Sequence, residues 1–250
     1  MIPIKTPADL ERMRASCRRT AALLSELLRR IVPGVTTAEL DAWAAERILE
    51  LGGRSAFKGY HGYPGHVCMS VNEEVVHGIP GPRRIQMGDL VSVDVGMMYD
   101  GFVGDTAGTV MVGVTDPEIV RLVEVTKAAL AAGIAAARVD ARVGDISHAV
   151  EQVVVAAGFS VVRSFVGHGV GRDLHEEPQV PNFGRAGQGP KLRAGMTLAI
   201  EPMVNAGAAE VKVLADGWTA VTADGRPSAH FEHTVAIGTE GPEVLTRSEA

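Results

Sequence analysis

Apolar residues recur at helical spacing in four segments of the chain. At Thr6–Asp9 a capping hydroxyl, a proline at the first helical position and an acid in the first turn predict a helix start. Its apolar face continues to Ile31, and Pro33-Gly34 predicts its end. Similar patterns predict further helices from about Thr37 to Leu51, from Asp116 onward and from about Asp145 to Ala157.

Short segments rich in β-branched residues lie between and after these helices, and they predict strands. Gly, Pro or Asp bounds most of them, as is typical of strands that end in turns. Because pairs of helices alternate twice with groups of strands, the pattern favours an α+β fold over an all-parallel α/β fold. The predicted strands are Val67–Val71, Leu90–Val95, Gly108–Val114, Phe159–Phe165, Thr197–Ile200, Glu210–Leu214, Thr219–Thr222 and His233–Ile237.

One pattern occurs twice along the chain. Gly88–Asp94 and Gly195–Glu201 each run from a glycine through five strand residues to an acid, at an offset of 107, and the helix before each strand recurs at an offset of 106. Each half supplies a second acid, Asp105 or Glu232. We therefore expect a single domain, 1–250, made of two pseudo-symmetric halves, about 6–114 and 116–238, whose four carboxylates meet at one central site.

Composition narrows the class of protein. A chain of 250 residues with 46% hydrophobic and 22% charged residues can bury a substantial core, which excludes a disordered chain. Its 24 Lys and Arg against 30 Asp and Glu leave a net charge of −6 (24 − 30), which argues against DNA binding. The two cysteines, Cys17 and Cys68, cannot build a disulfide framework. Without an apolar leader or an apolar segment of roughly 20 residues, we expect a cytoplasmic protein with no membrane contact.

Five residues suggest a metal centre. Asp94 ends an apolar strand and Glu201 follows one, Glu232 stands between Phe231 and a predicted strand, and Asp105 and His168 lie among glycines. Taken singly, the acids could cap turns and the histidine could be merely exposed. Together, four carboxylates and one imidazole suit two divalent cations such as Mn, Fe(II), Co or Zn, and a pair of such cations indicates hydrolysis.

Two further histidines and a group of aromatic residues are candidates for substrate contacts. His77 and His175 stand in stretches bounded by Pro and Gly, where they could hydrogen-bond a carbonyl, an oxyanion or an amine, or simply face water. Rings in loops could wall an apolar side-chain pocket or pack between the two halves. These large or soft apolar residues are Phe57, Tyr60, Tyr63, Cys68 and Trp218.

Four longer motifs accompany these residues: Asn72–Pro80, Gly167–Arg172, Leu174–Pro178 and Ala199–Pro202. With them, the chain from about Ile4 to Gly238 resembles the methionine aminopeptidases, in their short, bacterial-type type I form. The resemblance implies the "pita-bread" (creatinase/aminopeptidase-like) fold, which is α+β, pseudo-twofold and built on an antiparallel sheet flanked by helices. It also implies removal of the amino-terminal methionine from nascent proteins whose second residue is small.

The resemblance implies a role for each candidate ligand and catalytic residue. Asp94 would bind one metal, Asp105 and Glu232 would bridge both, and His168 and Glu201 would complete the second site. A hydroxide between the two metals would attack the first peptide bond, with Glu201 as the proton shuttle. In addition, His77 would contact the scissile nitrogen or the amine and His175 would stabilise the oxyanion.

The resemblance extends to the methionine pocket, which Phe57, Tyr60, Tyr63, Cys68, Leu174, Trp218 and the two catalytic histidines would line. Leu174 stands where an aromatic residue is common, and Phe57 where a cysteine is common. Asn72 and Ser228 resemble positions that bind Na or K. The implied partners are nascent amino termini and, transiently, the ribosome, with a monomeric enzyme.

Two alternatives remain at this stage. The metal-binding acids also resemble those of Xaa-Pro dipeptidases, but those enzymes usually carry an additional amino-terminal domain, and here the first helix begins at Thr6. A non-catalytic binding protein of the same fold is the other alternative. All five ligand positions are intact, which argues against it.

Overall fold

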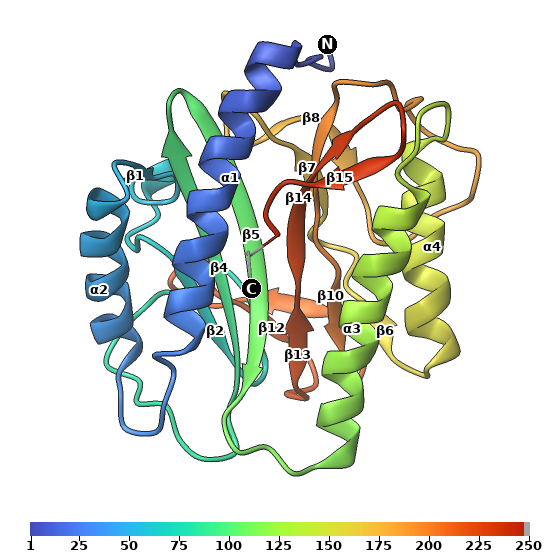
Figure 1. Ribbon diagram of the computed structural model, residues 1–250. Coiled ribbons are helices and arrows are strands. Elements are labelled where there is room, and N and C mark those ends of the chain that lie inside the picture. Colours follow the sequence, from blue (N-terminus) through green and yellow to red (C-terminus); the bar gives the residue numbers. More distant parts are fainter. Residues whose placement is uncertain (248–250) are drawn as a thin grey trace.

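The computed structural model describes residues 1–247 of the chain. Four long helices and a large antiparallel sheet make up most of it, as expected for the α+β class (Figure 1). In Figure 1, α1 crosses in front of β4 and β5, and α3 lies beside β14. The helices are α1 (Pro7–Leu28), α2 (Thr37–Glu50), α3 (Pro117–Ala136) and α4 (Val143–Ala156), with a short 3₁₀ turn, η1, at Tyr60–Gly62.

Helices α1 and α2 begin where the sequence predicts, each behind a threonine cap. The Thr6 hydroxyl accepts a hydrogen bond from the Asp9 backbone N–H, and the Asp9 carboxylate accepts one from the Thr6 backbone N–H, which forms a capping box at the start of α1. Thr36 and Glu39 make the same arrangement for α2. The prediction for the end of the first helix was three residues too long, because α1 stops at Leu28, although Ile31 is still buried in the core.

The main sheet has nine strands in the order β1-β4-β5-β14-β9-β7-β8, with β2 added to β4 and β15 to β14. All of its pairings are antiparallel. Its strands are β1 (Arg54–Ser55), β2 (Cys68–Val71), β4 (Leu90–Tyr99), β5 (Phe102–Met111), β7 (Gly167–Gly169), β8 (Glu176–Val180), β9 (Thr197–Ile200), β14 (Glu232–Ile237) and β15 (Pro242–Val244).

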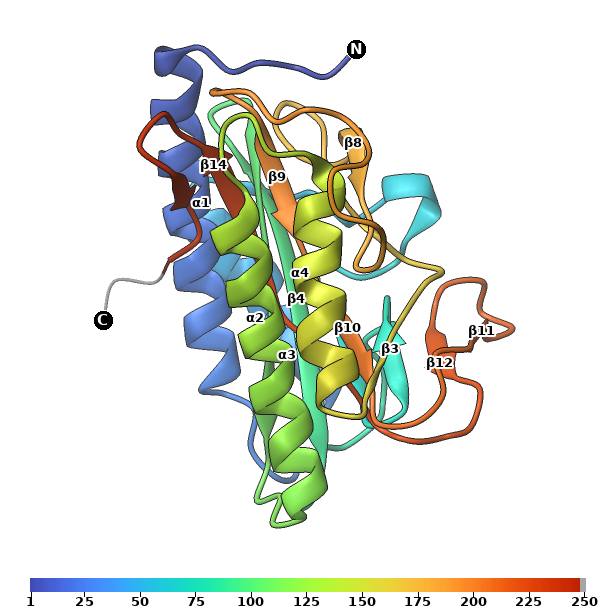
Figure 2. The ribbon, with the colours of Figure 1, turned by 90° about the vertical axis from the view of Figure 1, so that its right-hand side faces the viewer.

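Two small sheets complete the molecule. Figure 2 shows the β11–β12 hairpin and α1 on opposite sides of the main sheet. Within residues 1–247, no helix combines the length and the apolar composition that crossing a bilayer requires. The strands of the small sheets are β6 (Ser160–Val161), β10 (Met203–Asn205) and β13 (Ser228–His230) in one, and β3 (Glu74–Val76), β11 (Val211–Val213) and β12 (Ala220–Thr222) in the other.

The side chains of β4 divide between a helix-covered face and an open face. Its odd-numbered residues, Val91, Val93, Val95 and Met97, are buried in one cluster with leucines of α1 and with α2. Since successive side chains of a strand point to opposite faces, Asp94 points away from the helices. The α1 helix therefore fixes which face of the sheet is free to form a site.

Three predicted strands differ from the structure by more than one residue at an end. The strand predicted at Leu90–Val95 continues to Tyr99. Of the strand predicted at Gly108–Val114, only the residues to Met111 are strand, and they form the end of β5, which begins at Phe102. Glycines in the first half of β5 suggest turns, but full pairing with β4 holds this segment extended. Of the strand predicted at Phe159–Phe165, only Ser160–Val161 is paired.

Candidate metal centre

Strand register brings three of the predicted acids to the open face of the sheet. Asp94 on β4 and Glu232 on β14 both pair with Ala107 of β5, one from each side. Directly paired residues share a face of the sheet, and so do residues two apart on one strand. Asp105, two residues before Ala107, therefore shares the face of Asp94 and Glu232.

The remaining two predicted ligands reach the same face through β9. Thr234, two residues after Glu232, pairs with Ala199, and Ala199 pairs with His168 of β7. Glu201 follows Ala199 by two positions, immediately after β9 ends. All five predicted ligands thus lie on one face of the sheet, although they come from five different strands or strand ends.

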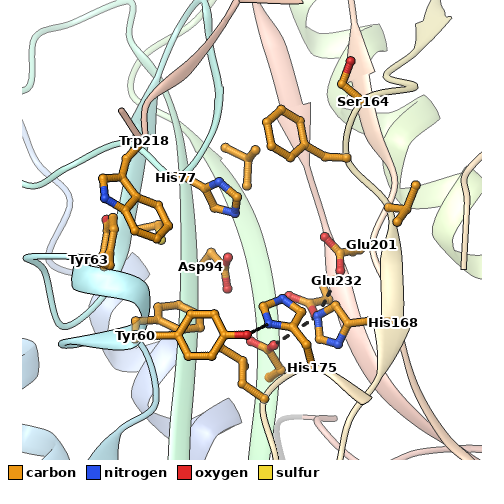
Figure 3. Close-up of a pocket in the computed structure, with 17 residues that line it drawn as sticks. Tyr60, Tyr63, His77, Asp94, Ser164, His168, His175, Glu201, Trp218 and Glu232 are labelled. Atoms are coloured by element: carbon orange, nitrogen blue, oxygen red, sulfur yellow. Dashed lines mark hydrogen bonds and ion pairs between the residues drawn. The ribbon is translucent and has the colours of Figure 1, made fainter. Parts of the chain in front are cut away.

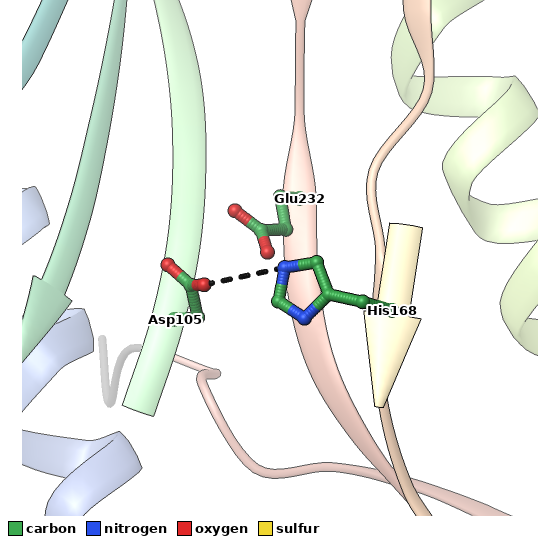
Figure 4. Close-up of side chains that lie close together, drawn as sticks. All are labelled: Asp105, His168 and Glu232. Atoms are coloured by element: carbon green, nitrogen blue, oxygen red, sulfur yellow. Dashed lines mark ion pairs between the residues drawn. The ribbon is translucent and has the colours of Figure 1, made fainter. Parts of the chain in front are cut away.

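The side chains converge closely. Ligand atoms of Asp105, His168 and Glu232 lie within 4.8 Å of one another (Figure 4). His168 Nε2 is 3.4 Å from Glu201 Oε1 and 3.7 Å from Asp105 Oδ2. The His168 Nδ1 atom is 2.9 Å from the Gly169 carbonyl oxygen, so Nδ1 carries the proton and the Nε2 lone pair points toward the acids.

The acids are buried with little compensation from the protein. Among the described residues, Asp94 Oδ1, Asp105 Oδ1 and Glu232 Oε1 are buried and have no hydrogen-bond partner. An unpartnered carboxylate oxygen in a protein interior is costly unless it is protonated or binds a cation. Together with the Nε2 lone pair of His168, these oxygens are a donor set that fits hard or borderline divalent cations.

Burial raises the pKa values of the four acids and so favours their uncharged forms. It raises the pKa of Asp94 to about 7, and it also raises that of Asp105 well above its ordinary value, with help from the Asp94 charge. The pKa values of Glu201 and Glu232 are also well above normal, from burial and from the neighbouring carboxylates. A bound divalent cation would reverse this, since it favours the ionised carboxylates.

A cavity of about 260 Å³ opens onto the acids (Figure 3). Its apolar wall includes Tyr63 and Trp218, whose rings stack edge to face at 5.1 Å. Phe57 packs so closely on Gly96 of β4 that a side chain at position 96 would overlap its ring. Every predicted ligand and pocket residue lines this cavity: Phe57, Tyr60, Tyr63, Cys68, His77, Asp94, Asp105, His168, Leu174, His175, Glu201, Trp218 and Glu232.

The two histidines predicted to be catalytic, His77 and His175, both line this cavity. His77 follows β3 with a positive φ of 60°, and its ring meets Phe165 edge to face at 5.3 Å. His175 lies just before β8, with its Nδ1 2.6 Å from the Tyr60 hydroxyl and its ring centroid 4.2 Å from that of His168. Burial lowers the pKa of His77 to about 4 and also lowers that of His175, so both rings are neutral at pH 7.

Residues 11–239 match the model of metallopeptidase family M24. The chain belongs to this family. It is 50% identical to the methionine aminopeptidase of Clostridium perfringens over 98% of this chain and 99% of that one. Identity to methionine aminopeptidase 1 of Bacillus subtilis is also 50%, over 99% of this chain and all of that one. The family assignment agrees with the buried cluster of Asp, His and Glu side chains, which fits divalent metal binding.

Solved structures share the fold. The methionine aminopeptidase of Thermotoga maritima superimposes with a TM-score of 0.97 at 49% identity, over 99% of this chain and all of that one. Prolidase from Pyrococcus furiosus gives a TM-score of 0.80 at 21% identity, over 99% of this chain but 66% of that one. The expected pita-bread fold is confirmed. The prolidase likeness extends to the fold alone, so the Xaa-Pro dipeptidase alternative is not favoured.

Three of the candidate metal ligands lie in a different local structure from the one that the sequence predicts. Asp94 lies in the middle of β4 rather than at its end, and Asp105 lies within β5 rather than in a glycine turn. His168 is part of the short strand β7 and is buried rather than exposed in a loop. In each case pairing with a neighbouring strand, which the sequence does not reveal, holds the segment extended.

Several residues of the cavity were not anticipated from the sequence. Val76, Ser164, Phe165 and Val166 also line it, and the proximity of the last three to the Gly167–Arg172 motif was a usable signal. His230, at the end of β13, is buried with its Nε2 3.9 Å from Glu201 Oε2. Its position two residues before Glu232 places it near the acids, but nothing in the sequence distinguished it from other histidines.

The two residues predicted to bind a monovalent cation are neighbours in the structure. The Ser228 backbone N–H donates to the Asn72 carbonyl oxygen at 2.9 Å. The Asn72 side chain donates to Asp89 and accepts from the Leu90 backbone, and the Ser228 hydroxyl donates to Val204. Their side chains are thus engaged within the protein, and a Na or K site built on them stays a prediction.

Proposed function

We propose that the protein removes the amino-terminal methionine from polypeptides whose second residue is small. The observation that carries this proposal is the combination of five metal-ligand side chains with an adjoining apolar cavity of about 260 Å³. The high identity to proteins named methionine aminopeptidases supports the same substrate. Release of a single amino-terminal residue suits a cavity of this size, because it accommodates one side chain beside the reacting bond.

The proposed metal site holds two divalent cations, of which Co, Mn, Fe(II) and Zn are all compatible with the donor set. Asp94 would hold one, Asp105 and Glu232 would serve both, and His168 and Glu201 would complete the other. Such cations, when bound, lower the pKa of water and polarise a substrate carbonyl. The residues of the chain then supply binding, orientation and proton transfer.

The methionine side chain of the substrate would lie against the apolar wall. Tyr63 and Trp218 offer large ring faces, and Cys68, whose neighbour across the sheet is Asp94, offers a soft, polarisable surface next to the metal site. Phe57, Tyr60 and Leu174 complete the wall. This arrangement would place the first peptide bond of the substrate over the acids, while the second residue extends toward the cavity opening.

The histidines and Glu201 are the proposed catalytic residues. The Tyr60 hydroxyl lies 2.6 Å from His175 Nδ1, and in the proposed tautomer it donates to Nδ1, which leaves a proton on Nε2 for the developing oxyanion. His77, neutral because of its lowered pKa, contacts the scissile nitrogen or the departing amine. Glu201 accepts the proton of the attacking water and passes it to the leaving amine.

The cellular setting is also a proposal. The enzyme acts in the cytoplasm as a monomer, on nascent amino termini and in transient contact with the ribosome. It is a single catalytic domain of two similar halves, about 6–114 and 116–238. The strand order β2-β4-β5-β14-β9-β7 supports this, since it is symmetric about the central β5–β14 pair.

Two substitutions test this proposal. His168→Ala and Glu201→Ala should each abolish release of methionine from a Met-Ala-Ser peptide, because they remove a ligand or the proton shuttle. Circular dichroism and the melting temperature check that the variants remain folded. A matched control is His148→Ala, which removes a partly buried histidine of α4 that does not line the cavity. Undiminished turnover in either cavity variant would falsify the assignment.

A further inference from the structure

A buried ion pair joins the segment before α1 to the loop that carries His175. The Lys5 ammonium contacts the Glu176 carboxylate, and the two side chains are only 5% and 8% exposed. Figure 2 shows the N-terminal segment crossing the end of the molecule where β8 and β9 lie. Since long charged side chains are rarely buried unless paired, this contact is a specific feature rather than a surface ion pair.

Both partners are fixed in place by further contacts. The Lys5 backbone N–H donates to the Gly195 carbonyl at 2.7 Å, which ties the N-terminal segment to the start of β9. Glu176 Oε1 accepts the Arg172 backbone N–H at 2.9 Å, so its carboxylate closes the loop of residues 171–176. A Cβ atom on Gly171 would lie 2.5 Å from Glu176 Oε1 and 2.6 Å from Lys5 Nζ, so only glycine leaves room for the pair.

The loop closed in this way presents two side chains to the cavity. Leu174 lines the apolar wall, and His175 lies beside Tyr60 and His168. His175 itself is exposed, and its ring contacts the side chains of Tyr60 and His168. Its position therefore depends on what holds Glu176, the next residue in the chain.

We propose that Lys5 is a positioning residue that, through Glu176, holds the 171–176 loop and thereby aligns His175 with the substrate carbonyl. The alignment part rests on the proposed function of His175, whereas the holding of the loop does not. Misplacement of a catalytic group by about 1 Å costs up to about 10²-fold in rate. Loss of the ion pair should therefore lower kcat much more than it changes KM.

The test uses the full chain with one single and one double substitution. Lys5→Met keeps an unbranched side chain but leaves the Glu176 charge unpaired, so reduced stability is expected. Lys5→Met/Glu176→Gln removes both charges and keeps an oxygen that accepts from Arg172, so its melting temperature should return toward the wild-type value. Arg14→Met is the matched control, because it breaks an α1 ion pair to Glu243 that does not reach the loop.

Two readouts separate the holding of the loop from catalysis. Amide hydrogen exchange of residues 171–176 should be faster in the double variant than in wild type and in Arg14→Met, while β5 stays protected. With a Met-Ala-Ser peptide, kcat of the double variant should fall about tenfold or more with little change in KM.

Unchanged exchange in the loop would overturn the proposal, and so would a kcat that recovers together with the melting temperature. If wild type fails to cleave the peptide, the proposed function is wrong, and hydrogen exchange alone decides whether Lys5 holds the loop.

Discussion

At the scale of single residues, the Tyr60–His175 hydrogen bond bears on which imidazole nitrogen carries the proton. The Tyr60 hydroxyl is 2.6 Å from Nδ1, so a donating hydroxyl leaves the proton on Nε2. Without the hydroxyl, the ring is free to adopt the other tautomer, in which Nε2 has no proton to donate. The apolar part of Tyr60 would still contact the methionine side chain.

Tyr60→Phe should therefore lower kcat about 5- to 10-fold, the equivalent of one ordinary hydrogen bond, with KM for a methionine peptide unchanged. His175→Ala, which removes the donor itself, should lower kcat about 10²- to 10³-fold. Steady-state kinetics of both variants checks the ranking. An unaltered kcat in Tyr60→Phe would show that the hydroxyl does not direct His175.

Asp94 makes the stability of the metal-free protein depend on pH. Burial raises its pKa from 3.8 to about 7, so the folded state favours the protonated form. The stability that this shift adds to the folded protein is fully present below pH 3.8. It is lost as the pH rises through about 7, where the buried Asp94 carboxyl must ionise. Each unit of pKa shift corresponds to about 1.4 kcal/mol.

In metal-free protein, Asp94→Asn should therefore be more stable than wild type at pH 8, and the difference should shrink toward pH 4. Urea unfolding after chelation measures it. Added divalent metal should reverse the order at pH 8, because only wild type keeps the full ligand set. A difference that does not vary with pH would mean that Asp94 is ionised in the metal-free fold.

The candidate residues were predictable from the sequence where an acid interrupts a buried pattern. Glu201 and Glu232 adjoin strands at the predicted places. Asp105 was a candidate too, but its setting was misjudged, because glycines 101 and 104 suggest a turn and only the pairing with β4 shows a strand. His230 was missed, since its closeness to Glu201 arises from the packing of β13, which no local pattern records.

At the scale of elements, the packing of α1 on β5 holds Asp105 in place. Gly104 and Gly108 both face α1, but they differ in the room that they leave. A Cβ on Gly104 would lie 2.5 Å from Thr20 Oγ1 and 2.9 Å from the Cys17 Cα atom. At Gly108 the first atom met is Leu28 Cδ1 at 3.3 Å, on a side chain at the end of the helix that can shift.

Gly104→Ala should accordingly destabilise the protein by about 1–3 kcal/mol through overpacking, whereas Gly108→Ala should be close to neutral. Because Asp105 follows Gly104 directly, metal affinity should fall in the first variant and not in the second. Thermal melting and isothermal titration with Mn check the two effects. Equal destabilisation by both substitutions would contradict the close approach of α1.

The bounds of the helices and strands were only partly predictable from the sequence, because some depend on local residues and others on distant ones. Helix starts depend on local caps such as Thr6 with Asp9, and these were predicted correctly. Strands β7 and β10 are three residues long and exist through pairing with distant segments. A segment of that length has no periodicity of its own, so its conformation follows from the rest of the fold.

At the scale of the whole molecule, part of the acidic charge belongs to the site. Two divalent cations would change the net charge of −6 to −2 (−6 + 4) before any bound anion is counted. Because the four buried acids repel one another without cations, metal binding and folding should be coupled. The excess of acidic residues is thus not located only on the solvated surface.

Chelation should lower the melting temperature and abolish turnover, and both should return with added divalent metal. Metal at about 100 times its dissociation constant stabilises a protein by about 2.7 kcal/mol. For a chain of this length, that is a shift of about 5–10 °C. Differential scanning fluorimetry during a Mn or Co titration measures it. A melting temperature that changes neither with chelator nor with added metal would contradict a metal centre built from these acids.

The most direct test of the central claim is a peptide assay on the purified chain. A Met-Ala-Ser peptide and an Xaa-Pro dipeptide are each incubated with added Mn, Co or Fe(II) and after chelation, with His168→Ala as control. The expected result is release of free methionine from the first peptide only, dependent on metal and absent in the variant. Cleavage of the Xaa-Pro dipeptide instead, or of neither peptide under any metal condition, would contradict the account.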